Sequence, residues 1–175
     1  MISIRDFILI PKDGELYTKN RMDKDSSLVL SAGIENHKNT NRIAVVISIP
    51  ADYIGDIKDG DEVIVHHNVF RKYSDIRGTE KFSSGLIREG MYSAEPIEVF
   101  AYRTPGSKWT SISPYIFVYP NRTSFGSVAI TNTEHELEGI TEGTEFFYNS
   151  ISEYEFVIEG EKMYRVNVRN ICATV

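Results

Sequence analysis

Four histidines are the first candidates for chemistry, because an imidazole can serve as a general base or as a metal ligand. His66 and His67 are adjacent in a segment with strand character, so we expect their side chains to point to opposite faces and not to share a metal ion. His37 and His135 lie in polar segments, with no cysteine or carboxylate at zinc-like spacing beside them. We therefore expect solvated histidines and no metal site.

Other reactive side chains also lack the partners that catalysis needs. Asp59, Asp61 and Glu62 form an acidic turn without the alternating pattern of a calcium-binding loop. No nucleophile with a paired base, P-loop or dinucleotide fingerprint is present. The single cysteine, Cys172, indicates a reducing compartment, and we expect it to be a small buried apolar residue. These observations predict a protein that is not an enzyme and uses no cofactor.

One basic and aromatic patch could contact a partner. Arg71-Lys72-Tyr73, together with Arg77 and Lys81, suits an acidic protein or a nucleic acid, although a solvated loop has the same composition. The whole chain has a formal net charge of -6, with both signs interspersed. Because nothing concentrates the positive potential that phosphate backbones require, we expect no nucleic-acid partner.

The composition is that of a soluble globular protein, with 41% hydrophobic and 25% charged residues. No apolar run approaches the roughly 20 residues that span a bilayer. Arg5 and Asp6 also interrupt the N-terminal stretch where a signal peptide would be apolar. We expect a cytoplasmic protein with no membrane partner, in the host cytoplasm if the chain is viral.

Short runs of β-branched and aromatic residues, bounded by Gly, Pro, Asn, Asp or Ser, predict the secondary structure. They cover residues 7–10, 43–49, 62–66, 96–102, 115–119, 127–131, 145–148, 154–158 and 163–168. No window of a dozen residues keeps a helical apolar period. The pattern predicts an all-β fold, with sheets closed into small barrels because closure protects sheet edges.

The order of these strand segments repeats within the chain. Four blocks align: Phe7–Ile10 with Tyr115–Val118, Ile43–Val45 with Val128–Ile130, Ile57–Val65 with Ile140–Tyr148, and Met91-Tyr92 and Val99–Ala101 with Met163-Tyr164 and Ile171–Ala173. In this alignment the second copy lacks about 23 residues of the first loop and about 11 of a later one. We predict two tandem domains, residues 1–103 and 104–175, with a linker-like boundary near Thr104.

The first copy has a long polar segment, residues 13–41, between its first two strands. Its only apolar island is Leu28-Val29-Leu30, framed by serine, alanine and glycine residues. Long loops on a rigid scaffold commonly carry function. Two interpretations are open: a short extra strand folded onto its own barrel, or a segment that binds a partner.

This segment resembles the mobile-loop core of the GroES (10-kDa co-chaperonin) family, in the residues Ser27, Leu28, Val29, Leu30 and Ser31. Asn41–Val46, Ile57–Val65 and Val99–Tyr102 resemble strands of that family, so the resemblance covers roughly residues 2–103. It implies two GroES-like β-barrel domains, the second with trimmed loops. It also implies a homo-oligomer that caps or docks on a GroEL-like chaperonin ring through residues 27–31.

The chain departs from the family pattern in its tandem second copy and in an inserted segment, Phe70–Gly90. By analogy, such departures suit a form encoded by a phage or another virus. An alternative function is therefore a structural or assembly protein of a virus particle, built from tandem GroES-like barrels. The two functions differ in location, because a lid is free in the cytoplasm whereas a structural protein copurifies with particles.

Overall fold

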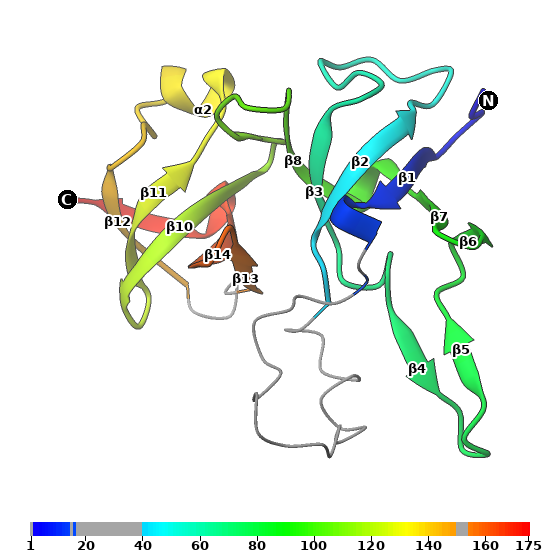
Figure 1. Cartoon of the computed structure of the whole chain (residues 1–175). Coiled ribbons are helices and arrows are strands. Elements are labelled where there is room, and N and C mark those ends of the chain that lie inside the picture. Colours follow the sequence, from blue (N-terminus) through cyan, green and yellow to red (C-terminus); the bar gives the residue numbers. More distant parts are fainter. Residues whose placement is uncertain (1, 15, 17–39, 150–153) are drawn as a thin grey trace. The chain divides into compact units, whose positions relative to one another are not determined.

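Two compact units make up the chain, Met1–Val99 and Phe100–Val175, in a computed structural model that describes residues 2–14, 16, 40–149 and 154–175 (Figure 1). The predicted boundary near Thr104 falls directly after β8 (Val99–Arg103), the strand at which the first unit ends. Strands dominate both units, so the all-β prediction is confirmed.

The first unit contains one antiparallel sheet and a separate hairpin. Its elements are β1 (Phe7–Pro11), the 3-10 turn η1 (Lys12–Gly14), β2 (Ile43–Ser48), β3 (Glu62–Val65), β4 (Lys72–Ser74), β5 (Glu80–Phe82), β6 (Leu86–Arg88), β7 (Met91–Ala94) and the 3-10 turn η4 (Pro96–Glu98). The sheet order is β6-β7-β1-β2-β3, and β4 pairs with β5 alone. Phe7, Leu9, Val46 and Ile64 are fully or almost fully buried and form the centre of this unit.

The second unit has a six-stranded sheet in the order β13-β14-β10-β11-β12-β15, with neighbouring strands antiparallel. Its elements are β9 (Thr110–Ser111), β10 (Tyr115–Arg122), β11 (Phe125–Ile130), the helix α2 (Thr133–Leu137), β12 (Glu145–Tyr148), β13 (Tyr154–Ile158), β14 (Glu161–Asn167), the 3-10 turn η6 (Val168–Asn170) and β15 (Ile171–Thr174). β9 pairs with β8. Ile116, Val118, Val128, Phe146 and Val166 belong to its core cluster.

Both units repeat the same strand pairing. Strands β7-β1-β2-β3 of the first unit correspond to β14-β10-β11-β12 of the second. Leu9 pairs with Val46 and Tyr92, and Val118 pairs with Val128 and Tyr164. The β1–β2 register shifts between Ile8 and Leu9, and the β10–β11 register shifts at the corresponding step, between Phe117 and Val118. Shared irregularities of this kind indicate one architecture used twice, because bulges are specific features of a sheet.

The turn before the third strand is repeated as well. In the first unit, Gly60 N donates to Val46 O (2.8 Å) and Val46 N donates to Asp61 O (2.9 Å). In the second unit, Gly143 N donates to Val128 O (2.9 Å) and Val128 N donates to Thr144 O (2.9 Å). Gly60 and Gly143 have φ values of 92° and 85°, a region that side chains rarely adopt. The glycine of each turn is therefore required by the backbone.

These pairings correct two blocks of the sequence alignment. Leu9 corresponds to Val118 rather than to Phe117, and Val46 rather than Ile43 corresponds to Val128. Short aliphatic runs match each other in several registers, so the residues alone do not fix which pairing forms. The third and fourth blocks agree with the structure, because the glycine turn and the Met-Tyr pair permit only one match.

Closure into barrels is not seen in the residues that the structure describes. The sheet of the second unit is open, with β13 and β15 at its edges. β13 carries Glu155, which forms an ion pair with Lys162 of the neighbouring β14 (2.9 Å). Charged residues on an edge strand discourage pairing with other chains, so this edge has protection other than closure.

The glycine turns give a direct test of the repeated backbone. We expect Gly143→Ala to lower the free energy of unfolding by about 1–2 kcal/mol, because a side chain strains the left-handed conformation. An added Cβ would meet no atom within 4 Å, so a steric clash would not contribute. Gly143→Asn, which tolerates this backbone better, should cost less. Urea denaturation measures both variants, and a Gly143→Ala protein as stable as the wild type would contradict the assignment.

Candidate functional site

The predicted partner-binding residues Ser27, Leu28, Val29, Leu30 and Ser31 lie outside the described part of the chain. Their role therefore stays a prediction. The structure does describe the two ends of the segment that carries them. The first end follows β1 at Lys12–Gly14, and the second end is Thr40–Arg42, directly before β2.

The two ends are held together at one point of the first unit. Asn41 Nδ2 donates to Lys12 O (3.2 Å), and Asn41 N donates to Leu16 O (2.8 Å). Lys12 Nζ also forms an ion pair with Glu62 Oε1 on β3 (2.8 Å). Thr40 and Arg42 are buried, at 3% and 4% exposure. The segment therefore leaves the sheet and returns to it through packed, hydrogen-bonded residues.

The second unit shows how little chain this connection needs. Pro11 pairs with Ala44 and encloses residues 12–43, whereas Pro120 pairs with Gly126 and encloses only residues 121–125. The backbone bond that follows is the same in both units: Val65 N donates to Arg42 O (2.8 Å), and Tyr148 N donates to Ser124 O (3.0 Å). The sheet can thus close this connection with a short turn, and residues 12–43 exceed what pairing requires.

A second extra element of the first unit is the β4–β5 hairpin, which carries the predicted basic and aromatic patch. The sequence predicted a continuous insertion over Phe70–Gly90. Part of that segment has a counterpart, however, because β6 pairs with β7 as β13 pairs with β14. Only the hairpin is additional. The sequence missed this division because the three-residue strands β4, β5 and β6 are too short to show a period.

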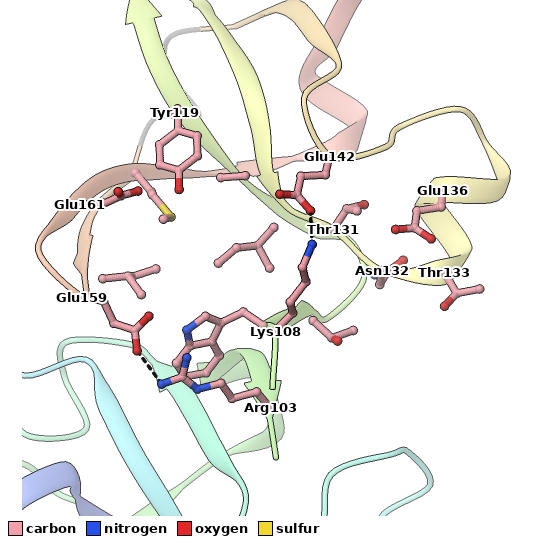
Figure 2. Close-up of a pocket in the computed structure, with 16 residues that line it drawn as sticks. Arg103, Lys108, Tyr119, Thr131, Asn132, Thr133, Glu136, Glu142, Glu159 and Glu161 are labelled. Atoms are coloured by element: carbon pink, nitrogen blue, oxygen red, sulfur yellow. Dashed lines mark hydrogen bonds and ion pairs between the residues drawn. The ribbon is translucent and has the colours of Figure 1, made fainter. Parts of the chain in front are cut away.

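A pocket of about 660 Å³ lies in the second unit (Figure 2). The segment from Arg103 to Thr110 borders it together with strands β10, β11, β13 and β14 and the residues at the start of α2. Apolar side chains of the sheet, including Ile130, Ile158 and Met163, line part of it, and these three are buried. Its volume lies in the range of about 300–1,000 Å³ that is usual for ligand sites.

Charged groups in this pocket are largely paired with each other. Arg103 Nη2 contacts Glu159 Oε1 at 2.5 Å, and Lys108 Nζ contacts Glu142 Oε2 at 3.0 Å (Figure 2). The Arg103 guanidinium also lies 4.3 Å from the centre of the Trp109 ring, a cation–π contact. These pairs fix the Arg103–Trp109 side of the pocket.

One tyrosine of the pocket has a perturbed acidity. A hydrogen bond to Glu161, with smaller effects of burial and of the negative charges of Glu161 and Glu142, raises the pKa of Tyr119 to about 12. Since the phenol stays protonated at neutral pH, Tyr119 is a hydrogen-bond donor there.

The structure places the histidines differently from their predicted positions. β3 ends at Val65, so His66 and His67 lie beyond it, and their rings contact each other at 4.3 Å between centroids rather than facing opposite sides. His135 lies in α2 and is buried at 2% exposure, where the sequence predicted a solvated loop residue. The helix was missed because five residues are too few for a periodic signal.

Metal ligands do not converge in the described part of the chain, where no group of three or more His, Cys, Asp or Glu residues could hold an ion. Cys172 is exposed because β15 is an edge strand with little covering it, so the prediction of a buried cysteine was wrong.

No helix among the described residues is long and apolar enough to cross a membrane. No protein-family model matches the chain, and no characterised protein matches it significantly.

The acidity of Tyr119 tests the pocket geometry. We expect Glu161→Gln to lower the pKa of Tyr119 from about 12 toward its ordinary value of 10.0, because the accepting carboxylate charge is removed. At pH 11, Tyr119 should then be mostly neutral in the wild type and mostly ionised in the variant. Carbon NMR of labelled tyrosine, assigned with Tyr119→Phe, measures this. Equal ionisation in both proteins would exclude the hydrogen bond.

Proposed function

We propose that the protein is a co-chaperonin-like binding protein, which docks on a chaperonin ring through the aliphatic residues Leu28, Val29 and Leu30. The observation that supports this most is the difference between the two units. The two units share strand order, register and a register shift. The connection between the first two strands nevertheless takes residues 12–43 in the first unit and only residues 121–125 in the second. A segment that the sheet does not need is best explained by a function outside the sheet.

The ends of this segment support its use as a binding loop. Lys12, Asn41 and Glu62 tie both ends to the first unit, so a partner that binds the loop is connected directly to a packed sheet. A loop with fixed ends also has less conformational freedom to lose on binding than a free tail of equal length. These contacts agree with a binding segment whose two ends are fixed.

Burial of the tripeptide would provide the affinity. Each aliphatic side chain that enters an apolar groove contributes about 1.5–3 kcal/mol before the cost of ordering the loop. One loop would then bind weakly, whereas several loops on a homo-oligomer would bind a ring with useful avidity and still allow release. Ser27 and Ser31 flank the tripeptide in the sequence.

The repeated strand pairing also bears on how the two units arose. We infer that both units derive from one GroES-like domain, since their pairing is the same from β1 to β3 and from β10 to β12. The second copy, with its short turn, would act as a structural spacer.

The test is binding of the purified protein to a chaperonin ring with and without ATP, followed by size-exclusion chromatography. We expect nucleotide-dependent binding by the wild type and a loss of at least about a hundred-fold in affinity for the triple variant Leu28→Ser, Val29→Ser, Leu30→Ser, since three apolar contacts are removed.

A matched control replaces only residues 17–39 with a short Gly-Ser linker. It should keep the melting temperature within a few degrees, because Lys12, Asn41 and their contacts stay in place, and it should not bind the ring. Absence of wild-type binding, or collapse of the triple variant's fold, would overturn the proposal. Copurification with virus particles at fixed stoichiometry would instead favour a structural role.

A further inference from the structure

The β4–β5 hairpin extends from the first unit as an arm (Figure 1). Its three ladder pairs, Lys72 with Phe82, Tyr73 with Lys81 and Ser74 with Glu80, join no third strand. A lone two-stranded hairpin is at best marginally stable in water, so its base must be anchored. Phe70 supplies the anchor, because it is fully buried and packs edge-to-face on Tyr92 with 5.0 Å between ring centroids.

Beyond this anchor the hairpin exposes apolar groups. Ile76, in the turn between the strands, is fully exposed, and Tyr73 and Phe82 remain 37% and 39% exposed. Two cations lie over the aromatic rings: Arg71 is 5.1 Å from the centre of Tyr73, and Lys72 is 5.6 Å from the centre of Phe82. Among the residues of the second unit that the structure describes, no element corresponds to this hairpin, so the shared strand pairing does not require it.

The charge of the arm is opposite to that of the chain. Residues 71–82 contain four basic side chains and two acidic ones, whereas the whole protein has a formal net charge of -6. Lys72 is paired with Glu80 at 2.6 Å. Arg77 and Lys81 form no ion pair with any residue that the structure describes. The arm therefore presents an isoleucine and two cations to an acidic partner.

The pocket of the second unit has the complementary character. Four glutamates and only two basic residues line it, and both basic residues already contact a glutamate. Glu136 and Glu161, which lie on opposite sides of the pocket in Figure 2, form no ion pair among the described residues. Ile130, Ile158 and Met163 line the same pocket. A pocket with apolar side chains and with carboxylates on two sides suits an apolar side chain flanked by cations.

We propose that the β4–β5 arm of one molecule binds the second-unit pocket of another copy of this chain. Ile76 would enter toward the apolar side chains of the pocket, and Arg77 and Lys81 would pair with Glu136 and Glu161. The volume of about 660 Å³ lies in the range of about 300–1,000 Å³ that is usual for binding pockets. A second copy is favoured over an unrelated partner because this chain itself supplies an acidic, partly apolar pocket in the same molar amount as the arm.

This interface joins two different patches, so it is heterologous. Each molecule would offer one arm and one pocket, and repeated head-to-tail contacts produce a ring if the rotation closes and a filament if it does not. The contact does not involve residues 27–31, so it can be tested without a chaperonin ring. Because its charge pairs lie at the surface, association should weaken as salt is added.

Reversal of the charges provides the test. Arg77→Glu with Lys81→Glu changes the arm, and Glu136→Lys with Glu161→Lys changes the pocket. Arg5→Glu with Lys58→Glu, at exposed positions, is a control with the same charge change as the arm variant. Sedimentation equilibrium of the full chain should show concentration-dependent association of the wild type and the control. Each reversal should weaken association at least about ten-fold, because attraction becomes repulsion.

An equimolar mixture of the two reversed proteins is decisive. Their reversed arm and reversed pocket are again complementary, so the mixture should associate although neither protein does so alone. Circular dichroism confirms that both are folded. A wild type that stays monomeric at about 100 μM would overturn the proposal. So would reversed proteins that associate like the wild type, or a mixture that recovers nothing.

Discussion

The register between the first two strands of each unit is the constraint on which the rest of the structure depends. In each unit, the residue directly after the register shift pairs with a valine of the second strand: Leu9 with Val46, and Val118 with Val128. The backbone of that valine is hydrogen-bonded to the glycine turn of the same unit. Both valines are 1% exposed. A shift of the strand register by one residue would expose the valine to water and break its two hydrogen bonds with the turn.

The two units share this strand pairing, so the differences between them indicate which elements the sheet does not require. Packing and hydrogen bonding account for the strands that the two units share. They do not account for the length of the segment 12–43, or for the β4–β5 arm, which has no counterpart among the described residues of the second unit. The protein thus combines a repeated scaffold with two elements that the scaffold does not need. A hydrogen bond between Asn41 and Lys12 joins the ends of the first element, and the second follows the buried Phe70.

The sequence was sufficient to predict the all-β class and the repetition, because both follow from the order of apolar runs and turn residues. It was insufficient for the register of the first two blocks. The apolar residues of Phe7–Ile10 align equally well with Leu9 opposite Phe117, as the sequence suggested, or opposite Val118, as the structure shows. The pocket could not be predicted at all. Its lining residues extend from Arg103 to Met163, and only the folded sheet brings Trp109, Glu136 and Glu161 to one site.

The most direct test of the binding account is hydrogen exchange of the full chain, measured by mass spectrometry with and without a chaperonin ring and ATP. The account predicts that amides of residues 27–31 gain protection in the complex, while peptides from β1, β2, β10 and β11 exchange as they do in the free protein. Protection of residues 27–31 that is already complete without the ring would contradict it, because the tripeptide would then belong to the fold.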